Sequence, residues 1–179
     1  MEQKIVITTL ECPGRLVPVG TPATIPANSF VTLTQSLGGS YTVVYQGNMI
    51  RIDGIDAAAI GFEPFEIKYP QRQPGAANEE DIWHTLHTIY DPEIPVNIVD
   101  LGLIYAVNIE TKKHSGSLVK VTMTLTAPGC GMGPVLIDDI QLRLNRAPNV
   151  SNVEVELVFD PPWNREMMSE EAQLELGMF

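Results

Sequence analysis

The chain has 179 residues, of which 44% are hydrophobic and 18% charged, so it can form a buried core and is not a disordered polymer. Twenty-two acidic residues against eleven basic ones give a net charge of −11, which argues against a nucleic-acid or anionic-membrane partner. Two cysteines are too few for a disulfide scaffold, no apolar run is long enough to span a bilayer, and the first residues lack the apolar core of an export signal. We therefore expect a cytoplasmic protein with free thiols.

Residues 1–70 are predicted to form a small all-β domain. Four stretches rich in β-branched and aromatic residues alternate with turn sequences such as CPG and LGGS. They are KIVITTLE, ATIPANSFVTLTQSL, SYTVVYQGNMIRIDG and FEPFEIKY. We expect a hairpin around Gln46, Gly47 and Asn48, and one short helical turn in GIDAAAIG. No constellation of chemically active residues is evident in this half.

Residues 70–78, PQRQPGAAN, are the most linker-like part of the chain. They contain two prolines, a glycine and no large apolar residue. The charge also changes here, because residues 1–75 carry six acids and five bases while residues 76–179 carry sixteen and six. The sequence thus predicts a domain boundary, with a second domain over residues 78–179.

The second half changes to an alternation of helices and strands. Asn78 is a predicted N-cap for a helix over residues 79–90, which the prolines of DPEIPVN end. The strands GLIYAVNIET and LVKVTMTLT, joined by the turn KKHSGS, precede a helix over residues 132–146. The strand VSNVEVELVF and a short helix capped by Ser169 complete the chain. The order α-β-β-α-β-α predicts an α+β fold, a two-layer sandwich with helices on one face of a small sheet.

Cys130 lies between a predicted strand end and a predicted helix start, in APGCGMG. The flanking glycines leave room for a partner atom to approach the sulfur. The free N–H groups at a helix start favour negative charge and therefore the thiolate. An ordinary small core cysteine is the competing interpretation, and bare backbone on both sides argues against it.

Three kinds of reactive cysteine compete for this position. A cysteine hydrolase needs a histidine base, and none of the three histidines, His84, His87 and His114, lies in a recognisable motif. A thioredoxin-like site needs CxxC, which is absent. A single thiolate cannot complete a zinc or iron–sulfur site, so a metal on Cys130 would need ligands from a second subunit, a small thiol or a client protein. Cys12, in LECPGR, is either a filler beside a turn, a second ligand or an oxidation partner of Cys130.

Three blocks of the second half carry a resemblance to a known family. They are YDPEIPVNIVDLGLIY, VKVTMTLTAPGCGMG and VEVELVFDPPWNREMMSEEA. Together, over about residues 78–175, they resemble the SufT-type iron–sulfur cluster assembly proteins, a longer branch of the PaaD-like metal–sulfur cluster biosynthesis domain family. The stretch LTQSLGGSYTVVYQGNMIRI in the first half is also similar to that branch. Shorter relatives often have proline after the cysteine, where this chain has Gly131 in the branch pattern PGCGMG.

The resemblance implies a set of site residues around Cys130 as the functional thiol and metal ligand. The matching positions are Asp91, Glu93, Asp100, Thr124 and Thr126. Asp91 and Asp100 also have an ordinary structural interpretation as turn-closing carboxylates, and the two threonines have one as β-branched strand residues. Trp163, in FDPPWNREMMS, is either an exposed anchor for a partner protein or a residue folded onto the sheet edge.

The resemblance implies a non-enzymatic factor that assists iron–sulfur cluster assembly or delivers clusters to apo-proteins. Its cargo would be a transient iron–sulfur cluster, and its partners would be scaffold or carrier proteins and apo-clients. A homodimer would bring two thiolates to one cluster, although nothing in the sequence requires it. One alternative is an adaptor that recruits clients without binding metal. A weaker third alternative is a thiol-dependent enzyme.

Overall fold

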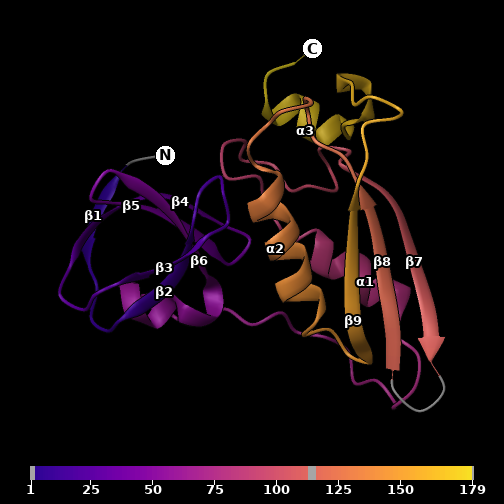
Figure 1. The fold of residues 1–179 in the computed structure, drawn as a ribbon, viewed down its shortest axis with the longest axis horizontal. Helices are drawn as coiled ribbons and strands as arrows, with labels where there is room; N and C mark the ends of the chain where they lie inside the picture. The colour runs from indigo at the N-terminus through magenta and orange to yellow at the C-terminus, as the bar shows by residue number, and fades with distance from the viewer. Residues whose placement is uncertain (1–2, 113–115, 179) are drawn as a thin grey trace.

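The computed structural model describes residues 3–112 and 116–178, and the first third of the chain forms one antiparallel sheet (Figure 1). The strand order is β1-β4-β5-β6-β2-β3. The strands are β1 Lys4–Ile7, β2 Cys12–Leu16, β3 Pro22–Ile25, β4 Phe30–Leu37, β5 Ser40–Tyr45 and β6 Asn48–Asp53. We call these six strands the N-terminal sheet. Together with the 3-10 helix η1, Gly54–Ile60, they enclose an apolar core of their own.

The predicted hairpin and helical turn are both present. Gln46 and Gly47 join β5 to β6 with φ values of 48° and 80°, the left-handed conformation that a two-residue hairpin turn needs. GIDAAAI forms η1, whose first turn is capped by Asp53 accepting a hydrogen bond from the amide of Ile55 at 3.1 Å. The alternating sequence of the first half therefore folds as its pattern indicates.

Two expectations for this half are wrong. CPG is part of strand β2 and not a turn. The strand tolerates Pro13 because β2 pairs with β6 only at Arg15 and Leu16, so β6 does not pair with the proline. The stretch FEPFEIKY forms no strand. Phe65 attaches to η1 through one backbone hydrogen bond to Gly54, and Tyr69 donates to or accepts from Thr85 of the next helix at 2.7 Å. The aromatic residues of this stretch cover neighbouring elements, as Phe62 does by stacking on Tyr41 of β5, and the stretch pairs with neither sheet.

The rest of the chain forms a three-stranded sheet with helices. The elements are α1 Glu79–Leu86, β7 Ile104–Lys112, β8 Gly116–Met123, α2 Gly133–Leu144, β9 Val150–Leu157, the 3-10 helix η2 Arg165–Met167 and α3 Glu170–Glu175. The sheet order is β7-β8-β9, antiparallel between β7 and β8 and parallel between β8 and β9. The order of helices and strands agrees with the predicted α-β-β-α-β-α. Residues 113–115 of the predicted KKHSGS turn, His114 included, lie outside the described residues.

One face of this second sheet is covered by α1 and α2. Val119, Val121 and Met123 alternate along β8 and therefore point to the same face. They share one buried core with Ile82 of α1 and Leu136 of α2. The N-caps are those the sequence predicts: the side chain of Asn78 accepts from the amide of Glu80, and that of Ser169 accepts from the amide of Ala172. Over residues 3–112 and 116–178, no helix combines the length and apolar content needed to cross a bilayer.

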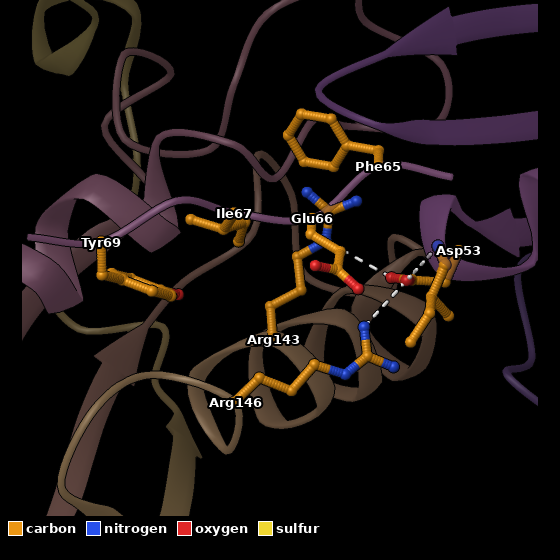
Figure 2. A pocket seen from close by; sticks show the side chains of 8 residues that line it. Asp53, Phe65, Glu66, Ile67, Tyr69, Arg143 and Arg146 are labelled. Carbon is orange, nitrogen blue, oxygen red and sulfur yellow. Dashed lines mark hydrogen bonds and ion pairs between the residues drawn. The ribbon is translucent and has the colours of Figure 1, made fainter. Parts of the chain in front are cut away.

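Helix α2 lies between the two sheets, and a network of buried charges joins it to the N-terminal sheet (Figure 1). Asp139, 1% exposed, pairs with Arg51 of β6 at 2.9 Å and also with Arg15 of β2. Asp53 pairs with Arg143 at 3.5 Å and with Arg146 at 2.9 Å, as Figure 2 shows. The two apolar cores thus remain separate, and ion pairs connect them.

The charges of this network stay paired although they are buried. Burial acts to raise the pKa of Asp53, but Arg143 and Arg146 outweigh it and hold that pKa below its usual value. Burial lowers the pKa of Arg143, and the nearby carboxylates of Asp53 and Asp139 offset part of that effect. Removing one member of such a network leaves an uncompensated buried charge, which is costly.

Candidate functional site

The turn DPEIP is closed by the side chain of Asp91. Its Oδ1 atom accepts hydrogen bonds from the amides of Glu93 at 2.8 Å and Ile94 at 2.9 Å, and the residue is buried. The two prolines exclude continued helix, so this carboxylate replaces the missing backbone partners. Asp91 therefore shapes the turn, whereas Glu93 is exposed to solvent.

Asp100 is oriented by Asn97, a residue that the sequence analysis does not single out. The Asn97 Oδ1 atom accepts from the amides of Val99 and Asp100 at 3.0 and 2.9 Å, and its Nδ2 atom donates to the Asp100 carboxylate. Asp100 is half-buried, and its carbonyl accepts from the amide of Ser169 at 2.8 Å. An asparagine placed two and three residues before amides it can cap is a recognisable signal for such a turn.

Cys130 lies in a turn ahead of α2. Its amide donates to the carbonyl of Ala127 at 3.1 Å, and Gly129 has a φ of 82°, which favours glycine. The Cys130 side chain is half-buried at the edge of the second core, three residues before α2 begins at Gly133. No side chain caps α2, whose Met132 N-cap makes no such hydrogen bond. Cys130 is thus only partly buried, next to a helix start that has no side-chain cap.

The two threonines lie beyond the end of β8. Thr124 is fully buried, its amide donates to the carbonyl of Leu103 at 2.8 Å, and its hydroxyl has no hydrogen-bond partner among the described atoms. Thr126 is half-buried. Both threonines lie outside the regular strand, so the shared strand face expected for them from the sequence does not apply here. Backbone contact with Leu103 joins the threonine segment to the loop that carries Asp100.

The proposed residues do not form a ready metal site within one chain. Among residues 3–112 and 116–178, no group of three or more histidine, cysteine, aspartate or glutamate side chains is placed to hold a metal ion. His84 and His87 are exposed on or beside α1, where His84 meets the Tyr69 ring edge-on and the His87 Nδ1 atom lies 2.7 Å from the Trp83 carbonyl. In the described part of the chain neither histidine is hydrogen-bonded to Cys130, so the histidine base of a hydrolase has no support.

The other cysteine is inaccessible. Cys12 is 0% exposed and lies in the core of the N-terminal sheet, apart from the core that Cys130 borders. Burial, with a smaller contribution from Asp56, raises the pKa of the Cys12 thiol from 9.0 to about 11. A thiol in that state is neither a ligand nor a nucleophile near neutral pH. Of the two cysteines, only Cys130 is presented to solvent.

Trp163 is folded onto the protein. Its indole Nε1 donates to the carbonyl of Leu101 at 2.7 Å, and the ring packs against the second core. Tyr105 donates to the carbonyl of Pro161 at 2.7 Å, which holds the same segment. The segment therefore supports the loop of Asp100, and Trp163 is half-buried against the sheet.

A cavity of about 270 Å³ lies at the opposite end of α2 from Cys130 (Figure 2). It is lined by Asp53, Ile55, Phe65, Glu66, Ile67, Tyr69, Arg143 and Arg146. Its charged groups Asp53, Arg143 and Arg146 belong to the ion-pair network described above. The cavity is therefore a feature of the junction between α2 and the N-terminal sheet and is separate from the thiol.

Comparison with known proteins assigns the second half of the chain. Residues 79–157 match the model of a family described as "Iron-sulfur cluster assembly protein". An "Fe-S protein maturation auxiliary factor" of Porphyromonas gingivalis is 50% identical over 99 residues, which cover 55% of this chain and 90% of that protein. The chain belongs to the iron–sulfur cluster assembly protein family.

Further relatives support this membership. An "Fe-S protein maturation auxiliary factor SufT" of Staphylococcus aureus is 41% identical over 90 residues, covering 50% of this chain and 98% of that protein. The crystal structure of a domain of unknown function from Bacillus anthracis superposes with a TM-score of 0.50 at 36% identity, covering 56% of this chain and 92% of that one. The SufT resemblance predicted from the sequence is thereby confirmed. Each relative is matched almost in full by about half of this chain.

Proposed function

We propose that this protein helps to assemble iron–sulfur clusters or to deliver them to apo-proteins, with the Cys130 thiolate as the transient attachment point. The observation that carries the proposal is the contrast between the two cysteines, since Cys130 is half-exposed in a turn while Cys12 is fully buried with a raised pKa. The cluster is cargo, and no catalysed reaction is required.

The other five residues of the predicted site take different parts in this proposal. Glu93, Asp100 and Thr126 are exposed or half-buried and would face an arriving cluster. Asp91 is occupied by two backbone amides and would hold the turn that carries Glu93. The Thr124 hydroxyl is buried and has no partner among the described atoms, so it would contribute from the buried side of the site.

One thiolate leaves most of a cluster's ligand positions open. The remaining ligands would come from a partner, which we propose to be a scaffold, carrier or apo-client protein, or a second copy of this chain. The strongly acidic second half, with sixteen acids and six bases over residues 76–179, would meet basic patches on such partners. A cytoplasmic location fits a protein that works through a free thiol.

We also propose that residues 1–70 and 78–179 are two domains. Two separate apolar cores support this division, as does the extended segment between η1 and α1. That segment is tied down at its end by Arg72, which makes two hydrogen bonds of 2.8 Å to Asp81. The relative arrangement of the two domains would then depend on the ion pairs of α2.

Anaerobic reconstitution with ferrous iron, sulfide and glutathione, whose thiol can supply the ligands that one chain lacks, tests the attachment point. Wild type and a Cys12→Ala control should take up equal amounts of cluster, measured by visible absorbance and by iron and sulfide content. Cys130→Ser should take up none above background. Equal uptake by all three proteins would overturn the role of Cys130.

The adaptor alternative makes a different prediction, because it needs an exposed contact surface and no thiol. Trp163, its proposed anchor, is hydrogen-bonded to the Leu101 carbonyl, which weakens that alternative. An adaptor would still restore growth of a deletion strain when it carries Cys130→Ser. The cluster-carrier proposal predicts that this variant fails to complement while folding normally.

A further inference from the structure

The N-terminal sheet contacts both turns of the proposed thiol site. We infer that it acts as a clamp: residues of β2, β4, β6 and the β2–β3 turn set the position and the accessibility of the Cys130 turn relative to the Asp91 turn. The biological consequence of the clamp rests on the proposed function, whereas the contacts that form it do not. The family match begins at residue 79, so it does not include the N-terminal sheet that forms the clamp.

The Asp91 turn is held by two side chains of the N-terminal sheet. The Gln35 Nε2 atom on β4 donates to the Asp91 carbonyl at 3.1 Å, and the Arg51 Nη2 atom on β6 donates to the Tyr90 carbonyl at 2.8 Å. Arg51 also donates to the Gln35 side-chain oxygen at 3.4 Å. Both side chains are buried, at 8% and 1% exposure. Two adjacent carbonyls of the turn are thus bonded to two rigid strands.

The Cys130 turn is held by packing against the β2–β3 turn. A Cβ atom placed on Gly131 would lie only 3.1 Å from the Pro18 ring, so the bare backbone next to Cys130 accommodates this proline. A Cβ atom on Gly20 would lie 3.5 Å from Pro134, at the start of α2. The glycine after the cysteine therefore has a packing role that the sequence alone does not reveal.

The β2–β3 turn is itself well fixed. The amide of Gly20 donates to the carbonyl of Leu16 at 2.7 Å, and the amide of Leu16 donates to the carbonyl of Thr21 at 2.8 Å. Val17 packs against the same core that Cys130 borders. The turn can therefore transmit the position of strand β2 to the Cys130 turn.

Buried charges link the two contacts. Arg51, which holds the Asp91 turn, pairs with Asp139 of α2 at 2.9 Å, and Arg15, just before the β2–β3 turn, pairs with Asp139 and lies 3.8 Å from Asp138. Helix α2 begins directly after the Cys130 turn. One ionic cluster therefore fixes α2, the Cys130 turn and the Asp91 turn to the same sheet. Arg143 of α2 adds hydrogen bonds to the Gly38 carbonyl in the N-terminal sheet and to the Thr88 carbonyl just before the Asp91 turn. Among the described residues, no hydrogen bond runs directly from Cys130 to Asp91 or Glu93.

Two substitutions loosen the clamp while leaving the thiol untouched. Gln35→Met removes the hydrogen bond to Asp91 and keeps the shape of the side chain. Arg15→Met removes a guanidinium, while Arg51 still neutralises Asp139. The matched control is Arg72→Met, which breaks an ion pair of the same kind with Asp81 of α1, away from both turns. All are compared in the full-length protein, and thermal unfolding identifies any variant that does not fold.

The readouts are the rate of Cys130 alkylation by iodoacetamide and amide hydrogen exchange over residues 91–97 and 127–133. Loss of one or two hydrogen bonds that hold a turn should raise its opening, and hence both rates, by about five- to tenfold. Exchange in β7 and β8 serves as an internal reference and should stay unchanged. Both rates should equal those of wild type in Arg72→Met.

The clamp is refuted if Gln35→Met and Arg15→Met fold but alkylate and exchange at the rate of wild type, or if exchange rises equally in β7 and β8. If only one of the two variants folds, its rates alone decide. Neither readout uses metal, so the test is independent of the cluster proposal. Failure of wild type to take up a cluster would overturn the proposed function and leave the clamp standing.

Discussion

Each half of the chain contains one cysteine, Cys12 in the first and Cys130 in the second, and the two halves place the thiol differently. The N-terminal sheet encloses Cys12 in its core, whereas the second sheet carries Cys130 on a half-exposed turn between β8 and α2. The relatives match the half with the accessible thiol. In the proposals made above, the first half contributes by contact and the second by chemistry, and each prediction below tests one of these two contributions.

The largest contrast should appear in thiol reactivity. With a pKa of about 11, Cys12 is thiolate in only about one molecule in a thousand at pH 8, and burial blocks the reagent as well. We expect Cys130 to be alkylated at least about a hundredfold faster than Cys12 in the folded protein. Peptide mass spectrometry measures both rates, and unfolding in urea should abolish the difference. Comparable rates in the native protein would contradict the burial of Cys12.

Two core truncations should separate the two halves. Ile52 and Leu136 are each 0% exposed, in the N-terminal and second cores respectively, so replacing either by alanine should cost about 2–5 kcal/mol. Hydrogen exchange should rise mainly in β4–β6 for Ile52→Ala and mainly in β7–β9 for Leu136→Ala. If both variants loosen both sheets equally, the cores are not independent and the comparison fails.

Arg51→Met should be the most damaging change at the junction of the halves. It removes the 2.9 Å partner of the buried Asp139 carboxylate and the donor to the Tyr90 carbonyl, so we expect a loss of about 3 kcal/mol in urea unfolding. Arg72→Met should cost less although Asp81 is buried, because Arg72 itself is 26% exposed and water can replace it beside that carboxylate. Equal stability of the two variants would show that the buried network does not hold the halves together.

The smallest effect should be a dependence of stability on acid. The pKa of Asp53 lies below its usual 3.8 in the folded state, so its charge stabilises folding fully above about pH 4, and that contribution disappears as the pH falls through the lower folded value. Asp53→Asn keeps an oxygen to cap η1 and removes the charge. The stability difference between wild type and this variant should be constant from about pH 5 to 7 and shrink below about pH 4. A difference that is the same at all pH values would contradict the assignment.

Much of the fold could be predicted from the sequence because its determinants are local. The helix caps Asn78 and Ser169, the hairpin at Gln46 and Gly47, and the alternation along β8 depend on residues a few positions apart. FEPFEIKY shows the limit, because its alternation is typical of a strand but it pairs with neither sheet. Whether such a segment pairs is decided by tertiary structure, which a local pattern does not contain.

The candidate site likewise has local features that the sequence predicts and long-range contacts that it does not. Cys130 and the Asp91 turn are visible as motifs, and the role of Asp91 in closing its turn follows from its two prolines and the amides beyond. The contact between Pro18 and Gly131 joins positions more than a hundred residues apart, and so does the pairing of Arg15 with Asp139. These contacts depend on how the two apolar cores pack together, which no spacing in the sequence expresses.

Whether a cluster attaches through Cys130 can be measured by asking if a bound cluster protects that thiol from alkylation. Wild-type protein is reconstituted anaerobically with iron and sulfide, desalted and exposed to iodoacetamide, and the modification of Cys130 is followed by mass spectrometry beside an untreated sample. The account predicts that the loaded protein is alkylated at Cys130 far more slowly, and that chelating the iron restores the original rate. Alkylation of Cys130 at the same rate with and without a bound cluster would contradict it.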